Sequence, residues 1–175
     1  MEKKEIITQL INFFKNFTNR CMIFDTDKTK GVIKLILNIL IKEFNTPFNI
    51  TVISPSTEYF NEVFPNLKGN IKLGAKYSVG KHKISLYKFD ESLVENPPSD
   101  SEILLVYPID NIKTKDLLKI LDSSKKLKKA VLLSNSYLDN VNKSFKKFNP
   151  DFISLKPHDD TSYYDIMKQK LFDIK

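Results

Sequence analysis

The sequence of 175 residues contains one cysteine, one arginine, four glycines and no tryptophan. The lone Cys21 excludes a fold held together by disulfides and a zinc site built from several cysteines. Apolar runs are short and are interrupted by lysine or asparagine, so no segment is long enough to span a bilayer. The first residues lack the apolar segment of a secretory signal. We therefore expect a soluble, intracellular protein without a membrane partner.

The composition indicates a folded chain. Hydrophobic residues make up 41% and charged residues 28%, which is enough apolar matter for a core and excludes a wholly disordered protein. The length fits one domain. We expect a single α/β domain over residues 1–175, with an N-terminal helix at 1–18 and a core at 20–172.

Positive charge is concentrated in one part of the chain. Lysine and arginine total 28 against 21 acidic residues, which gives a net charge of +7 and a pI near 9.3. Only Arg20 is an arginine, and lysine favours diffuse phosphate contact over the bidentate base contacts that arginine makes. Residues 113–147 hold ten lysines and three acids, so this segment carries a charge equal to that of the whole chain.

The hydrophobic pattern alternates between strands and helices. Strands that are apolar on both faces and separated by helices are typical of a parallel sheet covered on both sides. We therefore predict a doubly wound α/β fold with a mostly parallel sheet, helices on both faces and a β-hairpin excursion around 68–89. The predicted strands are 21–24, 49–54, 102–107, 130–134 and 151–155, and the predicted helices are 3–17, 31–44, 57–64, 114–121, 139–148 and 161–172. We also expect a loop at 95–100.

Sites in such a sheet form at the carboxyl ends of the strands. The strand, polar loop, glycine and buried helix around Gly31 have the layout of a phosphate-binding loop, GxxxxGK[ST]. With Gly31 as the second glycine, however, Val32 takes the lysine position and Ile33 takes the position of the hydroxyl that holds magnesium. A shifted register through Asp27-Lys28-Thr29 keeps a lysine and a threonine but places a carboxylate at the tight turn.

The acid that would hold magnesium after the 102–107 strand is also missing, because Asp110 comes late and is expected to be a turn residue. We predict no catalytic residue, no metal site and no cofactor, with ATP and Mg²⁺ as the alternative. The residues that would form such a degenerate nucleotide edge are Asp25, Thr26, Asp27, Lys28, Thr29, Lys30, Gly31, Asp110, Ser134 and Asn135.

Four stretches of the chain resemble viral DNA-packaging ATPases of the poxvirus type, in the FtsK–HerA superfamily of P-loop NTPases. They are Gly31–Leu40, Thr51–Pro55 with Tyr59, Ile103–Tyr107 and Ala130–Tyr137. The resemblance implies a three-layer P-loop-like sandwich and places Ser134-Asn135 where the family has its γ-phosphate-sensing pair. It further implies a non-hydrolysing relative from a DNA virus or similar replicon, found in host cytoplasm or virion. Such a relative would act as a binding or assembly component in DNA packaging or processing.

Two alternatives stay open. Residues 111–157 are similar to clamp-loader delta-prime subunits, which implies a structural subunit of a replication complex, although the zinc-binding cysteines of that family are absent. The other alternative is a weak nucleotide-binding ATPase with a non-standard phosphate loop. In each case we expect a protein partner or a homo-oligomer.

Seven lysines are expected at the amino-terminal rim of the sheet, opposite the nucleotide edge. Four precede a strand and three end the helix that follows it, and together they would form a patch for DNA or another polyanion, or simply a solvated face. They are Lys125, Lys126, Lys128, Lys129, Lys143, Lys146 and Lys147. Among the remaining polar candidates, His82 and His158 are expected to be exposed, and Cys21 to pack in the core.

Overall fold

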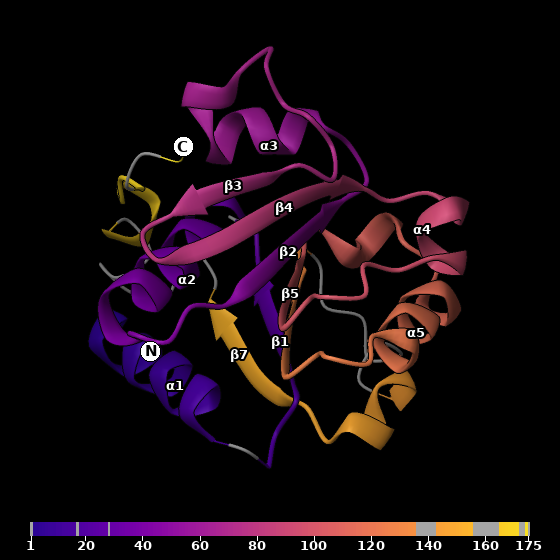
Figure 1. Ribbon diagram of the computed structural model, residues 1–175. Helices are drawn as coiled ribbons and strands as arrows, with labels where there is room; N and C mark the ends of the chain where they lie inside the picture. Colours follow the sequence, from indigo (N-terminus) through magenta and orange to yellow (C-terminus); the bar gives the residue numbers. More distant parts are fainter. Residues whose placement is uncertain are drawn as a thin grey trace.

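The computed structural model describes residues 2–16, 18–27, 29–135, 143–155, 165–171 and 174. Seven strands form one sheet in the order β3-β4-β2-β5-β6-β1-β7, and every pairing between neighbours is parallel except the one between β3 and β4 (Figure 1). This arrangement confirms the predicted α/β fold with a mostly parallel sheet. The strands are β1 Cys21–Thr26, β2 Asn49–Ser54, β3 Lys76–Val79, β4 His82–Lys88, β5 Ile103–Val106, β6 Lys129–Ser134 and β7 Asp151–Leu155.

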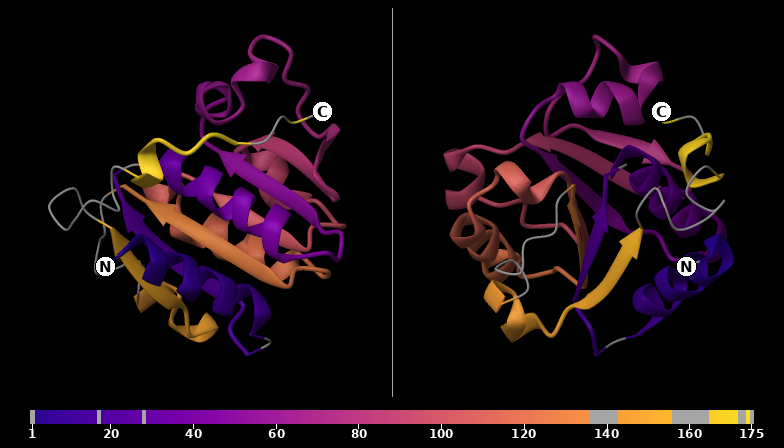
Figure 2. Two further views of the ribbon diagram at one scale, coloured as in Figure 1. Left: turned by 90° about the vertical axis from the view of Figure 1, so that its left-hand side faces the viewer. Right: turned by 180° about the vertical axis from the view of Figure 1, so that it is seen from behind.

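Helices cover both faces of the sheet, as Figures 1 and 2 show. Helices α1 (Lys3–Lys15) and α2 (Thr29–Glu43) lie on one face, and α4 (Glu91–Glu95) and α5 (Thr114–Ser123) lie on the other. Successive strand residues point to opposite faces, so Phe24 packs in the core beneath α1 and α2 while its neighbour Ile23 packs in the core beneath α5. Both faces of the central strands are therefore buried, which explains their continuous apolar sequences. Within the described residues, no helix has the length and apolar character needed to cross a membrane.

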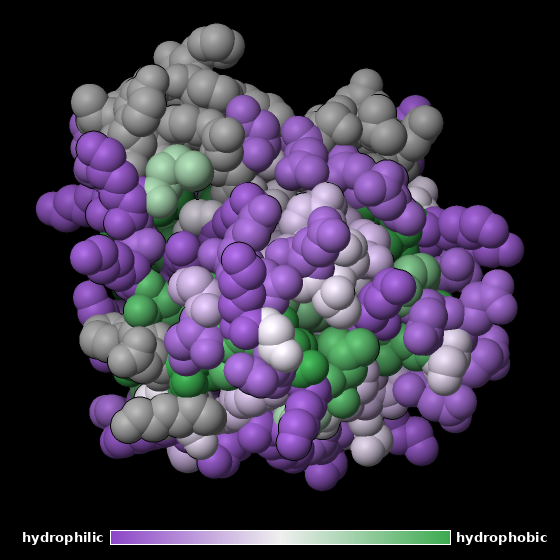
Figure 3. Space-filling view, turned by 90° about the horizontal axis from the view of Figure 1, so that it is seen from above, coloured by the Kyte–Doolittle hydropathy of each residue, from purple (hydrophilic) through white to green (hydrophobic). Residues whose placement is uncertain are grey.

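The predicted hairpin excursion is confirmed at one edge of the sheet. After α3 (Glu58–Val63) and the short 3-10 helix η1 (Pro65–Leu67), strand β3 turns into β4 at Gly80, whose φ of 58° is a left-handed value that glycine adopts readily. Strand β4 then pairs in parallel with β2. Seen from above, this side of the molecule is mainly hydrophilic around a narrower apolar band (Figure 3).

Helix α4 was not predicted from the sequence. It is a short helix that begins after Asp90, whose side chain accepts a hydrogen bond from the Leu93 N–H at 2.8 Å. Its buried residues, Leu93 and Val94, pack in the same part of the core as the buried residues of α5. Five residues are too few to show a helical period, so only the capping aspartate could have indicated this helix.

The C-terminal segment covers the middle of the polar stripe of α2. The sequence shows Lys34, Asn38 and Lys42 at every fourth position, which predicts a solvated stripe, but Asn38 is buried. Its Nδ2 donates to the Gln169 side chain at 3.1 Å and to the Lys170 carbonyl at 3.2 Å. The stripe is thus partly an interface between distant parts of the chain. Of the predicted helices 139–148 and 161–172, the structure describes residues 143–148, which include the 3-10 helix η3 (Lys146–Phe148), and residues 165–171.

The expectation of an exposed His82 is wrong. Its side chain is buried at the start of β4, where Nδ1 accepts a hydrogen bond from the Phe48 N–H at 3.0 Å and Nε2 donates to the Leu40 carbonyl at 2.8 Å. Leu40 is in the last turn of α2, where carbonyl groups lack partners within the helix. His82 therefore joins the end of α2 to the chain entering β2. His158 lies outside the described residues.

Candidate functional site

The carboxyl ends of β1, β6 and β7 bring several predicted polar residues to one edge of the sheet. Asp25 and Thr26 end β1 and are buried, and Ser154 of β7 donates a hydrogen bond to the Asp25 carboxylate at 3.4 Å. The parallel register aligns Asp25 with Ser134 of β6. These residues thus lie at one edge of the sheet, since parallel strands end together.

Asp110 links two of the strands at this edge. It lies in the 3-10 helix η2 (Ile109–Asn111) after β5. One carboxylate oxygen accepts a hydrogen bond from the Ser134 hydroxyl at 2.9 Å, and the other accepts one from the Asn135 N–H at 2.8 Å. Both oxygens are therefore engaged within the chain. The three residues that the nucleotide hypothesis singled out here, Asp110, Ser134 and Asn135, do meet, and they bond to one another.

The connection between β1 and α2 is short. Strand β1 ends at Thr26 and α2 begins at Thr29, so only Asp27 and Lys28 join them. A phosphate-binding loop places four residues between its two glycines and wraps their N–H groups around the phosphate. Two residues are too few to form that ring. Lys28 itself lies outside the described residues.

The side chains in the first turns of α2 are engaged within the protein. Val32 and Ile33, which occupy the motif's lysine and hydroxyl positions, are fully buried in the core. Lys30 makes an ion pair with Glu62 of α3. A Cβ atom at Gly31 would lie 3.2 Å from the Ile166 carbonyl oxygen, so the C-terminal segment runs directly over the start of α2.

These residues do not match the donors that ATP with Mg²⁺ requires. The lysine that reaches the terminal phosphates and the hydroxyl that holds the metal are replaced by aliphatic side chains. In the part of the chain that the structure describes, no group of three or more His, Cys, Asp or Glu residues is arranged to hold a metal ion. The described carboxyl edge is a hydrogen-bonded network, with the geometry of a structural junction.

The lysines at the opposite, amino-terminal edge fall into two kinds. The exposed kind comprises Lys125, Lys126, Lys128, Lys143, Lys146 and Lys147. Two of these are paired with acids, Lys128 with Glu102 at 3.0 Å and Lys147 with Asp122 at 2.6 Å. Both exposed groups precede strands, β6 in one case and β7 in the other, as the sequence predicted.

Lys129 is of the second kind. The sequence placed it in the exposed patch, and this prediction is wrong. Strand β6 begins at Lys129, one residue earlier than predicted, and its side chain is buried. The ammonium donates to the carbonyls of Asn16 and Asn19 and lies 4.6 Å from the centroid of the Phe13 ring. Burial lowers the pKa of Lys129, and the Asp151 carboxylate opposes this shift. Lys129 therefore fastens the end of α1 to the sheet, and its ammonium is not available at the surface.

Comparisons with known proteins place the fold. No family model matches the sequence, and no curated protein matches it. Two solved structures of the large terminase from a thermophilic bacteriophage are similar to this chain, one of them in complex with ADP. They have TM-scores of 0.59 and 0.58 and 10% sequence identity, and each alignment covers 94% of this chain. The chain spans about half the length of that terminase, at 47% and 46% coverage. The protein has an α/β fold of the kind found in a phage large terminase.

Proposed function

We propose that this protein is a P-loop-like domain that does not hydrolyse nucleotides and acts as a binding or assembly component in DNA packaging or processing. Two independent lines support the DNA-packaging context: the sequence resemblance to viral packaging ATPases, and a fold similar to that of a phage large terminase. Its partners in this role are DNA and either an active ATPase or further copies of the same chain.

The observation that carries the loss of hydrolysis is the two-residue connection between β1 and α2. Phosphoryl transfer depends almost entirely on positioning and electrostatic stabilisation of the phosphates. Without a loop long enough to surround them, and with Val32 and Ile33 in place of the lysine and hydroxyl, that stabilisation has no source at this position. The fold would then be retained as a scaffold for other contacts.

Nucleotide titration tests this part of the proposal. We expect ATP with Mg²⁺ to leave the melting temperature unchanged, and the purified protein to release no phosphate from ATP. A saturable rise in melting temperature that disappears in Lys28→Gln or Lys30→Gln would contradict the proposal and favour the weak ATPase alternative. Lys42→Gln, at the far end of α2, is the matched control for Lys30→Gln because it removes the same charge from the same helix.

Duplex DNA binding tests the other part. We expect binding that weakens as salt rises, since lysine–phosphate contacts release counterions. The triple change of Lys125, Lys126 and Lys128 to Gln should lower the salt slope by roughly 0.9 for each phosphate that the variant no longer neutralises. The matched control changes Lys68, Lys72 and Lys88 to Gln, which removes three exposed charges elsewhere. Undiminished binding by the first triple variant, with weaker binding by the second, would refute the assignment of the DNA surface.

A further inference from the structure

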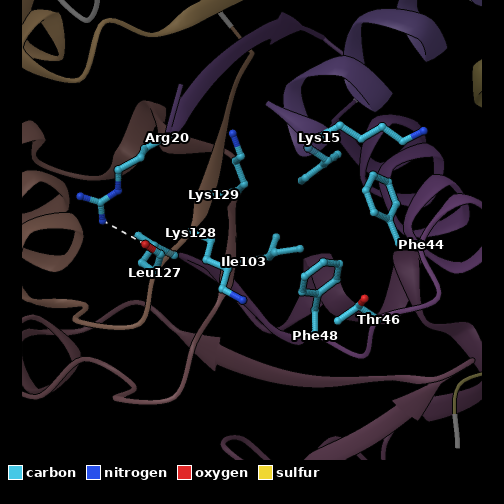
Figure 4. A pocket seen from close by; sticks show the side chains of 10 residues that line it. Lys15, Arg20, Phe44, Thr46, Phe48, Ile103, Leu127, Lys128 and Lys129 are labelled. Carbon is cyan, nitrogen blue, oxygen red and sulfur yellow. Dashed lines mark hydrogen bonds between the residues drawn. The ribbon is translucent and has the colours of Figure 1, made fainter. Parts of the chain in front are cut away.

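A pocket with an apolar floor opens at the amino-terminal edge of the sheet (Figure 4). Its volume is about 550 Å³. The end of α1, the connection between α2 and β2, and the first residues of β5 and β6 surround it. The lining includes three phenylalanines and four cationic residues, and none of the lining residues is acidic. This combination points to a ligand that carries both an apolar group and negative charge.

The phenylalanines form a connected wall. The ring centroids of Phe14 and Phe44 are 6.1 Å apart, and those of Phe44 and Phe48 are also 6.1 Å apart. Phe48 is held in place because His82 stacks on it, with ring centroids 5.5 Å apart and planes 7° from parallel. A ligand that stacks on Phe48 can therefore use only its opposite face. All three rings are half-buried, so each retains surface for a ligand.

The cations surround this wall and extend beyond it. Lys128 is paired with Glu102 at 3.0 Å, and its ammonium also lies over the Phe48 ring, 5.9 Å from the centroid, so a base that stacks on Phe48 would share the ring with this ammonium. Lys15 projects beside Phe44 in Figure 4. Lys125 and Lys126 are exposed in the loop that leads to Lys128. Arg20 donates to the Leu127 carbonyl at 3.1 Å and, with buried Lys129, contributes charge behind the pocket. The cationic side chains thus extend over more of the surface than a single anion would occupy.

We propose that this pocket holds an unpaired base of single-stranded nucleic acid, with flanking phosphates contacting Lys15 and Lys128. Aromatic rings in a cationic groove are how proteins hold single strands without sequence preference, because every base has a flat face that can stack. The phosphates continue along Lys125 and Lys126. A base inside a duplex cannot enter the pocket, so the site distinguishes single strands from duplex. This inference rests on the proposed function and specifies the form of the nucleic acid.

A tryptophan reporter tests the inference, because the chain has no tryptophan of its own. Phe44→Trp places a single indole in the pocket wall. We expect a thymine oligonucleotide to quench its fluorescence saturably, and a duplex of the same length to leave it unchanged. In the otherwise native protein, Phe48→Leu should weaken single-strand binding roughly tenfold or more while leaving duplex binding unchanged. Phe152→Leu, an exposed aromatic on β7, is the matched control, and thermal melting checks that each variant is folded.

Charge variants test the proposed phosphate contacts of the pocket. Lys15→Gln with Lys128→Gln should reduce the salt slope for single strands by roughly 0.7 for each phosphate left without its lysine, whereas Lys68→Gln with Lys88→Gln should not. Equal binding of single strands and duplex, unaffected by Phe48→Leu, would overturn this inference and leave the proposed function standing. Binding of neither form would overturn both the pocket assignment and the DNA part of the proposed function. Quenching by an acidic, phenylalanine-containing peptide but not by the oligonucleotide would overturn it in favour of a protein partner.

Discussion

Removal of the His82 ring should disconnect the end of α2 from the start of β2. The imidazole is buried and makes three interactions at once: it accepts from the Phe48 N–H, donates to the Leu40 carbonyl and stacks on the Phe48 ring. His82→Phe keeps an aromatic ring of similar size at this position but can make neither hydrogen bond. His82→Ala removes the ring as well.

The magnitude follows from the groups left behind. A buried donor or acceptor without its partner costs about 1–3 kcal/mol. His82→Phe leaves two such groups without partners, and Phe48 is half-buried, so we place the decrease in unfolding free energy at about 2–4 kcal/mol. His82→Ala also removes the ring stacking and leaves a cavity. We therefore expect its unfolding free energy to decrease by about 4–6 kcal/mol.

Urea unfolding followed by circular dichroism measures these differences. His82→Gln, whose amide can both donate and accept, should recover part of the stability that His82→Phe removes. Lys83→Gln, the exposed neighbour, should change the stability by less than about 0.5 kcal/mol. If the unfolding free energy of His82→Phe lies within about 1 kcal/mol of that of the unmodified protein, the two hydrogen bonds do not join these elements as described.

Three further predictions concern other polar side chains. Burial raises the pKa of the Cys21 thiol to about 12, so a thiol reagent at roughly neutral pH should label it only when urea unfolds the chain, and rapid labelling of the native protein would contradict its burial. Burial of Glu102 favours a higher pKa, but the Asn49 N–H and the Lys128 ammonium outweigh this and hold the pKa below its ordinary value of 4.5. The stabilisation that Glu102 provides is therefore complete above pH 4.5 and disappears as the pH falls through the folded-state pKa. Glu102→Gln should make the melting temperature fall less steeply on acidification, and an unchanged acid profile would count against this. Asn38→Leu should release residues 165–171 from α2, detected as faster hydrogen exchange there, and unchanged exchange would show that its side-chain bonds do not hold the segment.

Local sequence patterns were sufficient to predict the sheet and its edges. The β5 stretch and the central part of the β6 stretch consist of consecutive apolar residues. Only a parallel sheet covered on both faces buries both sides of such strands. The same reasoning placed Asp25, Asp110 and Ser134 at one edge, because the carboxyl ends of parallel strands coincide. The replacement of the phosphate-loop lysine and hydroxyl by Val32 and Ile33 was also visible without coordinates.

Tertiary structure decided the surroundings of individual polar side chains. His82, Lys129 and Asn38 occupy positions whose local sequence predicts exposure, yet each is buried by a segment distant in the chain. Their partners are mainly backbone carbonyls and amides that helix ends and loops leave unpaired, and sequence carries no local signal for such a group. The pocket of phenylalanines likewise joins elements from separate parts of the chain. Periodicity reports which face of an element is apolar, whereas burial of a polar group depends on which distant backbone group packs against it.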